Sequence, residues 1–104
     1  MLDLILFALV GALFMNGLPH FVAGSAGRVF RTPFGHYSSP QTNIVWGMSN
    51  FLAATIVFTW RASVSGVTTA RAIAMLVGFW LVILMFGTGA KRFFDDRDHL
   101  PPKK

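Results

Sequence analysis

The side chains best suited to chemistry lie in two short groups inside apolar stretches of the chain. Asn16 and His20 are four residues apart at the end of the first stretch, so in a helix they share one face. The second stretch carries amide and small residues at spacings of four, three and four, namely Asn43, Gly47, Asn50 and Ala54. Polar groups buried among apolar ones need hydrogen-bond partners. We therefore expect these two faces to pack together, with Asn16 and His20 near Asn43 or Asn50.

The elements that must position these groups are long and almost free of charge. The chain has 104 residues, of which 54% are apolar and 12% charged, against about 25% charged in ordinary soluble domains. Three stretches contain no Asp, Glu, Lys or Arg: Leu4 to about Phe21, Asn43 to Trp60, and Ala72 to about Ala90. Each is near the roughly 20 residues with which a helix crosses a bilayer. The sequence predicts an all-α membrane protein with three transmembrane helices in a single domain.

The expected boundaries follow from turn and capping residues. We place helix one at about 4–21, a cytoplasmic loop at 22–39, helix two at about 40–60, a short outer loop at 61–70, helix three at about 71–90 and a basic cytoplasmic tail at 91–104. Ser39 and Pro40 are typical of an N-cap and a first helical position. The first apolar run lacks a basic flank and is long for a signal peptide, so we expect it to stay as a membrane helix.

The distribution of cations predicts the orientation. Two lie on the side of the N-terminus, Arg61 and Arg71; seven lie on the other, Arg28, Arg31, Lys91, Arg92, Arg97, Lys103 and Lys104. Because cytoplasmic segments are enriched in Lys and Arg, the N-terminus is expected outside and the C-terminus in the cytoplasm. The basic residues flank membrane spans, so membrane lipids rather than nucleic acid are the expected partners. Arg28, Arg31, Lys91 and Arg92 are the candidates for contacting anionic headgroups.

The polar cluster then allows two interpretations. In the first, the amides only join helices one and two, and Pro19 kinks or ends helix one. In the second, the cluster floors a small pocket open to the cytoplasm, with Arg28 and Arg31 above it to hold a phosphate or another anionic group. The floor of that pocket consists of Asn16, His20 and Asn50.

Several kinds of chemistry are excluded or disfavoured by composition. The chain has no cysteine, and its acidic residues are Asp3, Asp95, Asp96 and Asp98, so residues 4–94 contain no carboxylate side chain. Proton-coupled transport commonly uses an intramembrane carboxylate, which these spans lack. His20, His36 and His99 form no closely spaced pair. We therefore expect no metal site and no cofactor.

Small residues in the third stretch predict a helix–helix contact. Ala70, Ala74 and Gly78 recur at four-residue spacing, the pattern that lets two helix backbones approach in lipid. This row is the expected surface for a protein partner or for a second copy of the chain.

Four short motifs carry a resemblance. The series "NGLPHF", "RTPFG", "SSP" and "NIVWGMSN", between about residues 14 and 52, resembles a group of small bacterial multi-pass membrane proteins that share an NGxPHF, TPFG, SSP and NxxWG pattern. The resemblance implies a bacterial cytoplasmic (inner) membrane location and a few helices. It implies no substrate, cofactor or catalytic residue.

Three functional classes follow from these features. The first is a small accessory or scaffold subunit that packs with itself or with a larger membrane complex, and it is the one that the sequence favours. The second is a homo-oligomeric passive channel or transporter lined by amide and hydroxyl faces. The third is a protein or enzyme that binds lipid headgroups with His20, Arg28 and Arg31, of which His20 is the only acid–base residue expected near a membrane interface.

Overall fold

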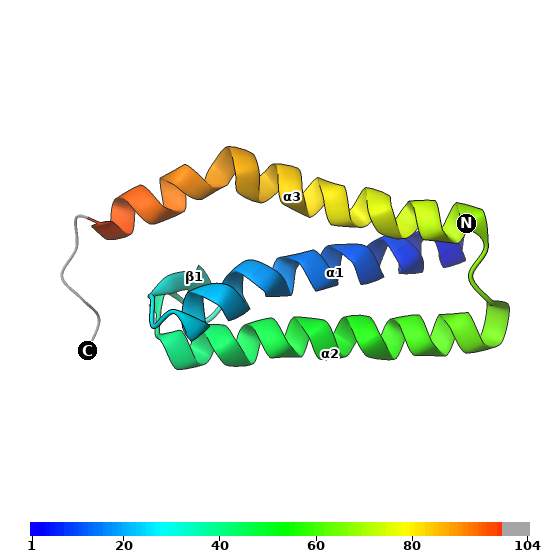
Figure 1. The fold of residues 1–104 in the computed structure, drawn as a ribbon, viewed down its shortest axis with the longest axis horizontal. Coiled ribbons are helices and arrows are strands. Elements are labelled where there is room, and N and C mark those ends of the chain that lie inside the picture. The colour runs from blue at the N-terminus through cyan, green and yellow to red at the C-terminus, as the bar shows by residue number, and fades with distance from the viewer. Residues whose placement is uncertain (99–104) are drawn as a thin grey trace.

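The described part of the chain forms three long helices and one small hairpin. The structure, a computed structural model, describes the backbone of residues 1–98 and the side chains of residues 1–89. The elements are α1 (Leu2–Ser25), β1 (Phe30–Thr32), β2 (Gly35–Ser38), α2 (Pro40–Ser65) and α3 (Thr69–Asp98) (Figure 1). The expected helical class holds for most of the chain. The two strands correct the expectation that it is helical throughout.

Helix α1 lies between the other two helices. It packs along α2, to which it runs antiparallel, and along α3, to which it runs roughly parallel (Figure 1). Helices α2 and α3 follow one another as an antiparallel pair, but both pack against α1 rather than against each other. The arrangement is thin, with extents of 49 × 24 × 19 Å.

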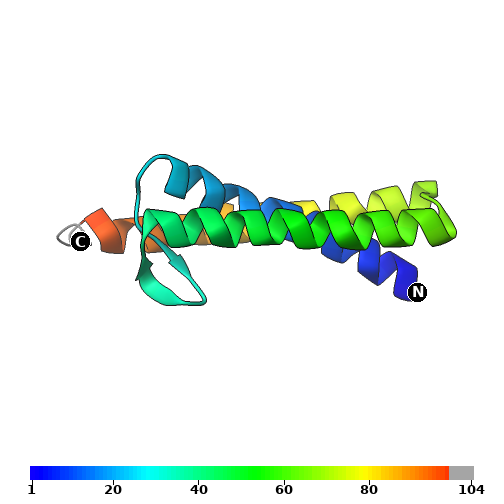
Figure 2. The ribbon, with the colours of Figure 1, turned by 90° about the horizontal axis from the view of Figure 1, so that it is seen from below.

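The inclination of α1 leaves room for the hairpin. Figure 2 shows that α1 starts on one face of the helix layer and ends on the other. The hairpin lies on the face that the C-terminal half of α1 has left, where β1 contacts all three helices. The connection between α1 and α2 is therefore a packed element and not a simple loop.

Helix α1 runs past Pro19 and beyond the predicted end near residue 21. It continues to Ser25, where Gly27 adopts a positive φ of 74° and the chain turns away. A proline inside a helix removes one hydrogen bond and costs about 3 kcal/mol. The turns beyond Pro19 offset this cost because they bury His20, Ala23 and Gly24.

The hairpin is built on local hydroxyl contacts. Its strands are antiparallel, and the Oγ1 atom of Thr32 lies 2.6 Å from the Oγ atom of Ser38 across them. Thr32 Oγ1 also accepts a hydrogen bond from the backbone N–H of Phe34, and Ser38 Oγ donates to the carbonyl of Gly35. With Pro33 in the turn, these contacts close residues 30–38 into a hairpin of two strands.

The start of α2 is confirmed, and its end is later than predicted. Ser39 caps the helix by accepting a 3.1 Å hydrogen bond from the backbone N–H of Thr42, and Pro40 is the first helical residue. The helix runs to Ser65 and ends at Gly66, whose φ is 74°. The predicted outer loop 61–70 is thus only a three-residue link, because the charge of Arg61 is paired within the fold and does not force the helix to end there.

Helix α3 also extends beyond its predicted end. Its backbone is helical to Asp98, so most of the tail expected from residue 91 continues the helix. The final residues, 99–104, lie outside the described residues.

Two of the three helices are apolar and long enough to cross a membrane by length and composition. They are Leu2–Ser25 and the Thr69–Gly89 portion of α3, with mean hydropathies of 1.8 and 2.2. Helix α2 does not reach the same hydropathy among the described residues. Its polar residues account for the difference, and the structure shows where those residues lie.

Glycines bring the helix backbones together. Gly17 of α1 faces Gly47 of α2, where a side-chain carbon on either residue would come within 2.7 Å of the other's carbonyl oxygen. Gly78 of α3 lies directly against the backbone carbonyl of Ala8, and Gly11 lies against that of Met75. The three helices are therefore in backbone contact through residues that leave no room for a side chain.

Gly78→Ala should loosen α3 from α1, because the added methyl group would overlap the carbonyl of Ala8. We expect a loss of about 1–3 kcal/mol in the free energy of unfolding, measured by circular dichroism during a denaturant titration in micelles. Gly87→Ala is the control on the same helix, since nothing lies within 4 Å of the added carbon. Equal shifts for the two variants would contradict this packing.

Candidate functional site

The predicted polar faces of α1 and α2 meet at one end of the molecule. The Nδ2 atom of Asn16 donates a 3.1 Å hydrogen bond to Oδ1 of Asn50, and Nδ1 of His20 lies 2.9 Å from Oδ1 of Asn43. The two pairs are about one helical turn apart on α1 and about two turns apart on α2, with the Gly17–Gly47 contact between them. The structure thus brings together the four side chains that the spacing placed on facing surfaces.

Asn43 makes most of the hydrogen bonds that join the elements at the hairpin end. It is fully buried, and its Nδ2 atom lies within hydrogen-bonding distance of the carbonyl oxygens of Phe30, Ser38 and Ser39 at 2.9, 3.2 and 3.1 Å. Its Oδ1 atom faces His20. One amide side chain therefore joins α1, α2 and both strands of the hairpin.

These contacts determine which nitrogen of the neutral His20 ring carries the proton. The amide of Asn43 must direct its NH₂ group at the three carbonyls, so the oxygen is the atom that faces His20. An amide oxygen only accepts hydrogen bonds, so Nδ1 of His20 carries the proton and donates. In the neutral imidazole, Nε2 then bears the lone pair and acts as an acceptor.

Aromatic rings enclose His20 from the side of the hairpin. The ring of Phe30, which is 1% exposed, lies 4.9 Å from the His20 ring between centroids. Phe86 of α3 lies 6.2 Å from both rings. His20 is 5% exposed as a result, and its ring position is set by contacts with α2, α3 and the hairpin.

A pocket of about 490 Å³ opens beside this cluster. Asn16, His20 and Arg31 line it, so three of the residues predicted for a site share one cavity. Pro19, Asn43 and Asn50 do not line it, but Asn50 and Asn43 are hydrogen-bonded to the lining residues Asn16 and His20. Arg28 is exposed and does not line this pocket.

The rest of the lining comes from residues that the sequence did not single out. They are the hairpin residues Thr32, Pro33, Gly35 and His36, and Trp46 of α2. The sequence did contain clues to these residues. His36 lies between two X-Pro segments in the connection between helices one and two, and Trp46 directly precedes Gly47 of the small-residue face. Without a hairpin, neither could be placed against His20.

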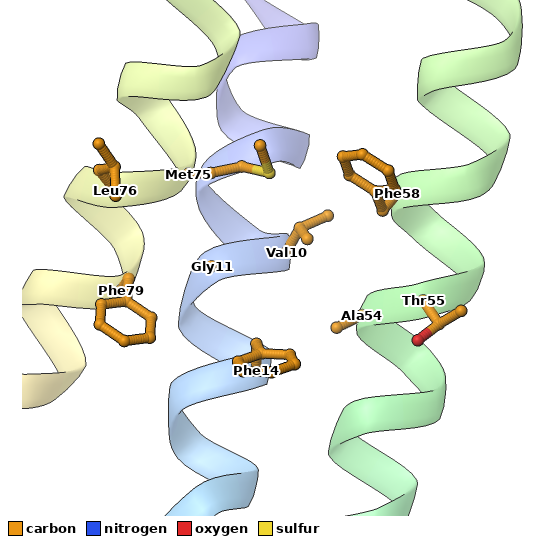
Figure 3. A pocket seen from close by; sticks show the side chains of 9 residues that line it. All are labelled: Val10, Gly11, Phe14, Ala54, Thr55, Phe58, Met75, Leu76 and Phe79. Carbon is orange, nitrogen blue, oxygen red and sulfur yellow. The ribbon is translucent and has the colours of Figure 1, made fainter. Parts of the chain in front are cut away.

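A second cavity, of about 410 Å³, lies between α2 and α3 over α1 (Figure 3). Its walls include Phe58 of α2 and Phe79 of α3, and Val10 and Phe14 of α1 form its floor. The hydroxyl of Thr55 donates to its own helix at the carbonyl of Phe51. This groove presents apolar surface and offers no group for binding a polar ligand.

The other end of the molecule carries an ion cluster that the sequence did not predict. The carboxylate of Asp3 bonds to Arg61 of α2 and, at 3.0 Å, to Arg71 of α3. Arg71 also donates to the carbonyl of Ser65 at 2.7 Å. The three helices are therefore tied together by one carboxylate. This ion cluster could have been predicted, since the predicted topology placed Asp3 on the same side of the membrane as both arginines.

The row of small residues on α3, predicted as a surface for a partner, packs against α1 at its Gly78 end. Gly78 is buried against Ala8, whereas Ala74 is half-buried and Ala70 is exposed. Lys91 and Arg92 belong to the part of α3 whose side chains lie outside the described residues. Within the part of the chain that the structure describes, no three His, Cys, Asp or Glu side chains lie together as metal ligands.

Comparison with known proteins identifies no relative of this chain. No known protein family, curated protein or solved structure matches this chain. The function must be argued from the geometry of this chain.

Asn43→Asp should release the hairpin, because a carboxylate oxygen would replace the NH₂ group that faces three carbonyls. Leaving such buried groups unpaired costs about 1–3 kcal/mol or more. We expect faster amide hydrogen exchange across residues 30–38, measured by mass spectrometry in micelles. Ser49→Ala is the control, since that hydroxyl is exposed and bonds only within α2. Unchanged exchange in Asn43→Asp would contradict the role of this amide.

Proposed function

We propose that this chain is a three-span integral protein of the bacterial inner membrane and acts as a small accessory or scaffold subunit. The observation that carries the proposal is the reversed burial of α2. Its buried residues are Asn43, Gly47, Asn50 and Ala54, while large apolar side chains such as Val45, Leu52 and Ile56 are 58–64% exposed. A helix that hides its amides and exposes its aliphatic residues matches lipid as its surroundings.

This reversal supports α2 as a third span despite its lower hydropathy. Asn43 and Asn50, which reduce its hydropathy, are paired with α1 and with the hairpin, and the hydroxyls of Ser49 and Thr55 donate to carbonyls of α2 itself, so these groups are satisfied within the protein. With 26 residues and a rise of about 1.5 Å each, α2 exceeds a hydrocarbon core of about 30 Å.

The orientation rests on the cations. Arg28 and Arg31 lie at the hairpin end, and the remaining five cations of that side lie in the last part of α3 or after it in the sequence. Only Arg61 and Arg71 occupy the opposite end, where Asp3 pairs with both. The positive-inside rule then supports a hairpin in the cytoplasm and an outer link at 66–68. The bacterial location rests on the resemblance of the hairpin and its flanking motifs.

An accessory role suits the single layer of helices. Because α2 and α3 pack on α1 and not on each other, exposed apolar side chains remain on each helix, for example Leu9, Leu52 and Leu81. Such a layer offers a large lateral surface for a neighbouring protein. A channel is supported less well, since the asparagine faces that would line a pore are used between α1 and α2.

The topology can be tested with single cysteines, since the chain contains none. Val67→Cys, in the outer link, should react with a membrane-impermeant maleimide added to intact cells. Tyr37→Cys, in the hairpin, should react only after the membrane is opened. Labelling of both positions in intact cells, or of neither after lysis, would contradict three spans in this orientation.

The subunit role can be tested by photo-crosslinking in native membranes. A benzophenone maleimide attached to Ala70→Cys, on the exposed end of the small-residue row, should give an adduct with a membrane protein or a second copy. Ser63→Cys is the control, because it is exposed at the corresponding end of α2. The proposal fails if Ala70→Cys forms no protein adduct and the chain purifies alone as a monomer in mild detergent.

A further inference from the structure

Trp80 occupies a position that tryptophan seldom takes in a membrane helix. Trp60 lies near the outer end of α2 and Trp46 lies near its hairpin end, as expected for a residue that is concentrated at the two membrane surfaces. Trp80 lies instead near the middle of Thr69–Gly89, the apolar part of α3, and it is 56% exposed. In the proposed three-span arrangement, on which this inference rests, Trp80 therefore lies in the hydrocarbon core.

The indole N–H of Trp80 has no hydrogen-bond acceptor among the residues that the structure describes. The hydrocarbon core contains no water that could accept this hydrogen bond. A tryptophan removed from water usually finds an acceptor for its N–H group. The unpaired donor therefore points to an acceptor on a neighbouring molecule at the same depth.

Thr55 of α2 provides such an acceptor in the same chain. Its hydroxyl donates a 2.8 Å hydrogen bond to the carbonyl of Phe51, and its oxygen keeps lone pairs that can accept one. Thr55 precedes the end of α2 by 10 residues and Trp80 follows the start of α3 by 11, so both lie about 15–17 Å along their helices from the link between them. Two copies inserted in the same orientation therefore present the donor and the acceptor at one level.

The apolar groove between α2 and α3 provides space for the Trp80 ring of a second copy (Figure 3). Thr55 and Leu76 belong to its opposite walls, and Trp80 is about one turn from Leu76 on the same face of α3. The groove measures about 410 Å³, whereas an apolar cavity of about 150 Å³ already holds a benzene ring. Its walls suit an apolar ring with a single N–H group better than they suit a polar ligand.

We propose that two copies of this chain form a symmetric dimer in the membrane, in which Trp80 of each copy enters the apolar groove of the other and donates its indole N–H to Oγ1 of Thr55. A two-fold axis along the membrane normal keeps each residue at its own depth and lets α3 of each copy lie over the groove of the other. One chain thus holds the donor, the acceptor and the groove. A phospholipid acyl chain would fill the groove without offering an acceptor to the indole.

The test is Förster energy transfer between copies of the full chain that carry a donor or an acceptor dye at Val67→Cys in the outer link. The chain has no cysteine of its own, so each copy carries one dye. Mixed copies in phosphatidylcholine vesicles should show energy transfer that decreases as added lipid dilutes the protein. The dilution curve gives the dissociation constant of the dimer.

Substitutions at the two contact residues then test the proposed hydrogen bond. Trp80→Phe keeps an aromatic ring and removes the N–H, so it should weaken the dimer about threefold, the size of an average interhelical hydrogen bond in lipid. Thr55→Val should have a similar effect, and the double variant should be no weaker than either single variant, because all three lose the same hydrogen bond. Trp60→Phe and Ser49→Ala are the matched controls, an exposed tryptophan and an exposed hydroxyl elsewhere on α2, and both should leave the dissociation constant unchanged.

The inference fails if energy transfer is absent at every protein-to-lipid ratio, or if Trp60→Phe weakens the dimer as much as Trp80→Phe does. Additive losses in the double variant would show that Trp80 and Thr55 do not meet. A monomer that retains phospholipid in native mass spectrometry would assign the groove to an acyl chain. A monomer whose Ala70→Cys variant crosslinks to a different protein would lose the dimer and keep the accessory role. The cysteine labelling of intact cells tests the topology separately.

Discussion

The hydrogen bonds of the Asn43 side chain are the interaction on which the hairpin end depends. In lipid there is no water to satisfy a polar group, so a buried amide must find every partner within the protein. Asn43 does so by bonding to three backbone carbonyls and to His20. The hairpin has only seven strand residues and would be marginal alone. Its attachment to Asn43, together with the buried ring of Phe30, makes it part of the helix layer.

Backbone proximity between helices sets the second constraint. Because Gly17 and Gly47 allow α1 and α2 to approach closely, the amides on either side of this contact come within hydrogen-bonding distance. Gly78 does the same for α3 and α1. The hairpin packs beside the C-terminal half of the inclined α1 (Figure 2), and the apolar groove of Figure 3 lies over the middle of α1, at Val10 and Phe14.

The parts of the fold that the sequence predicted are those decided by one helix alone. The spacing of Asn43, Gly47, Asn50 and Ala54 defines a face whatever the helix packs against, and the structure buries these four residues of α2. Ser39 and Pro40 likewise define a helix start by local chemistry. The hairpin was not predicted because Thr32 and Ser38 stabilise it only once the chain has already turned.

Other features depended on contacts between distant segments. Pro19 predicts a helix end locally, but burial of His20 and Gly24 against α2 and the hairpin extends α1 past it. The length of α2 likewise depended on where Arg61 finds a carboxylate. Of the candidate site, Asn16, His20 and Arg31 were predicted from residue type and topology. His36 and Trp46 could not be, because their places follow from the fold of the hairpin.

The two ends of the molecule are held together by different interactions. At the end opposite the hairpin, Asp3 pairs with Arg61 and Arg71, whose side chains are only 17% and 20% exposed. The guanidinium of Arg61 also lies 4.8 Å from the centre of the Trp60 ring. These charges hold helices together and have little capacity left for a ligand. At the hairpin end, Arg28 and Arg31 are exposed, and the connection that carries them contains no acidic residue. Arginine therefore joins the helices at one end, whereas at the other end the hairpin is attached through the amide of Asn43 and the buried ring of Phe30.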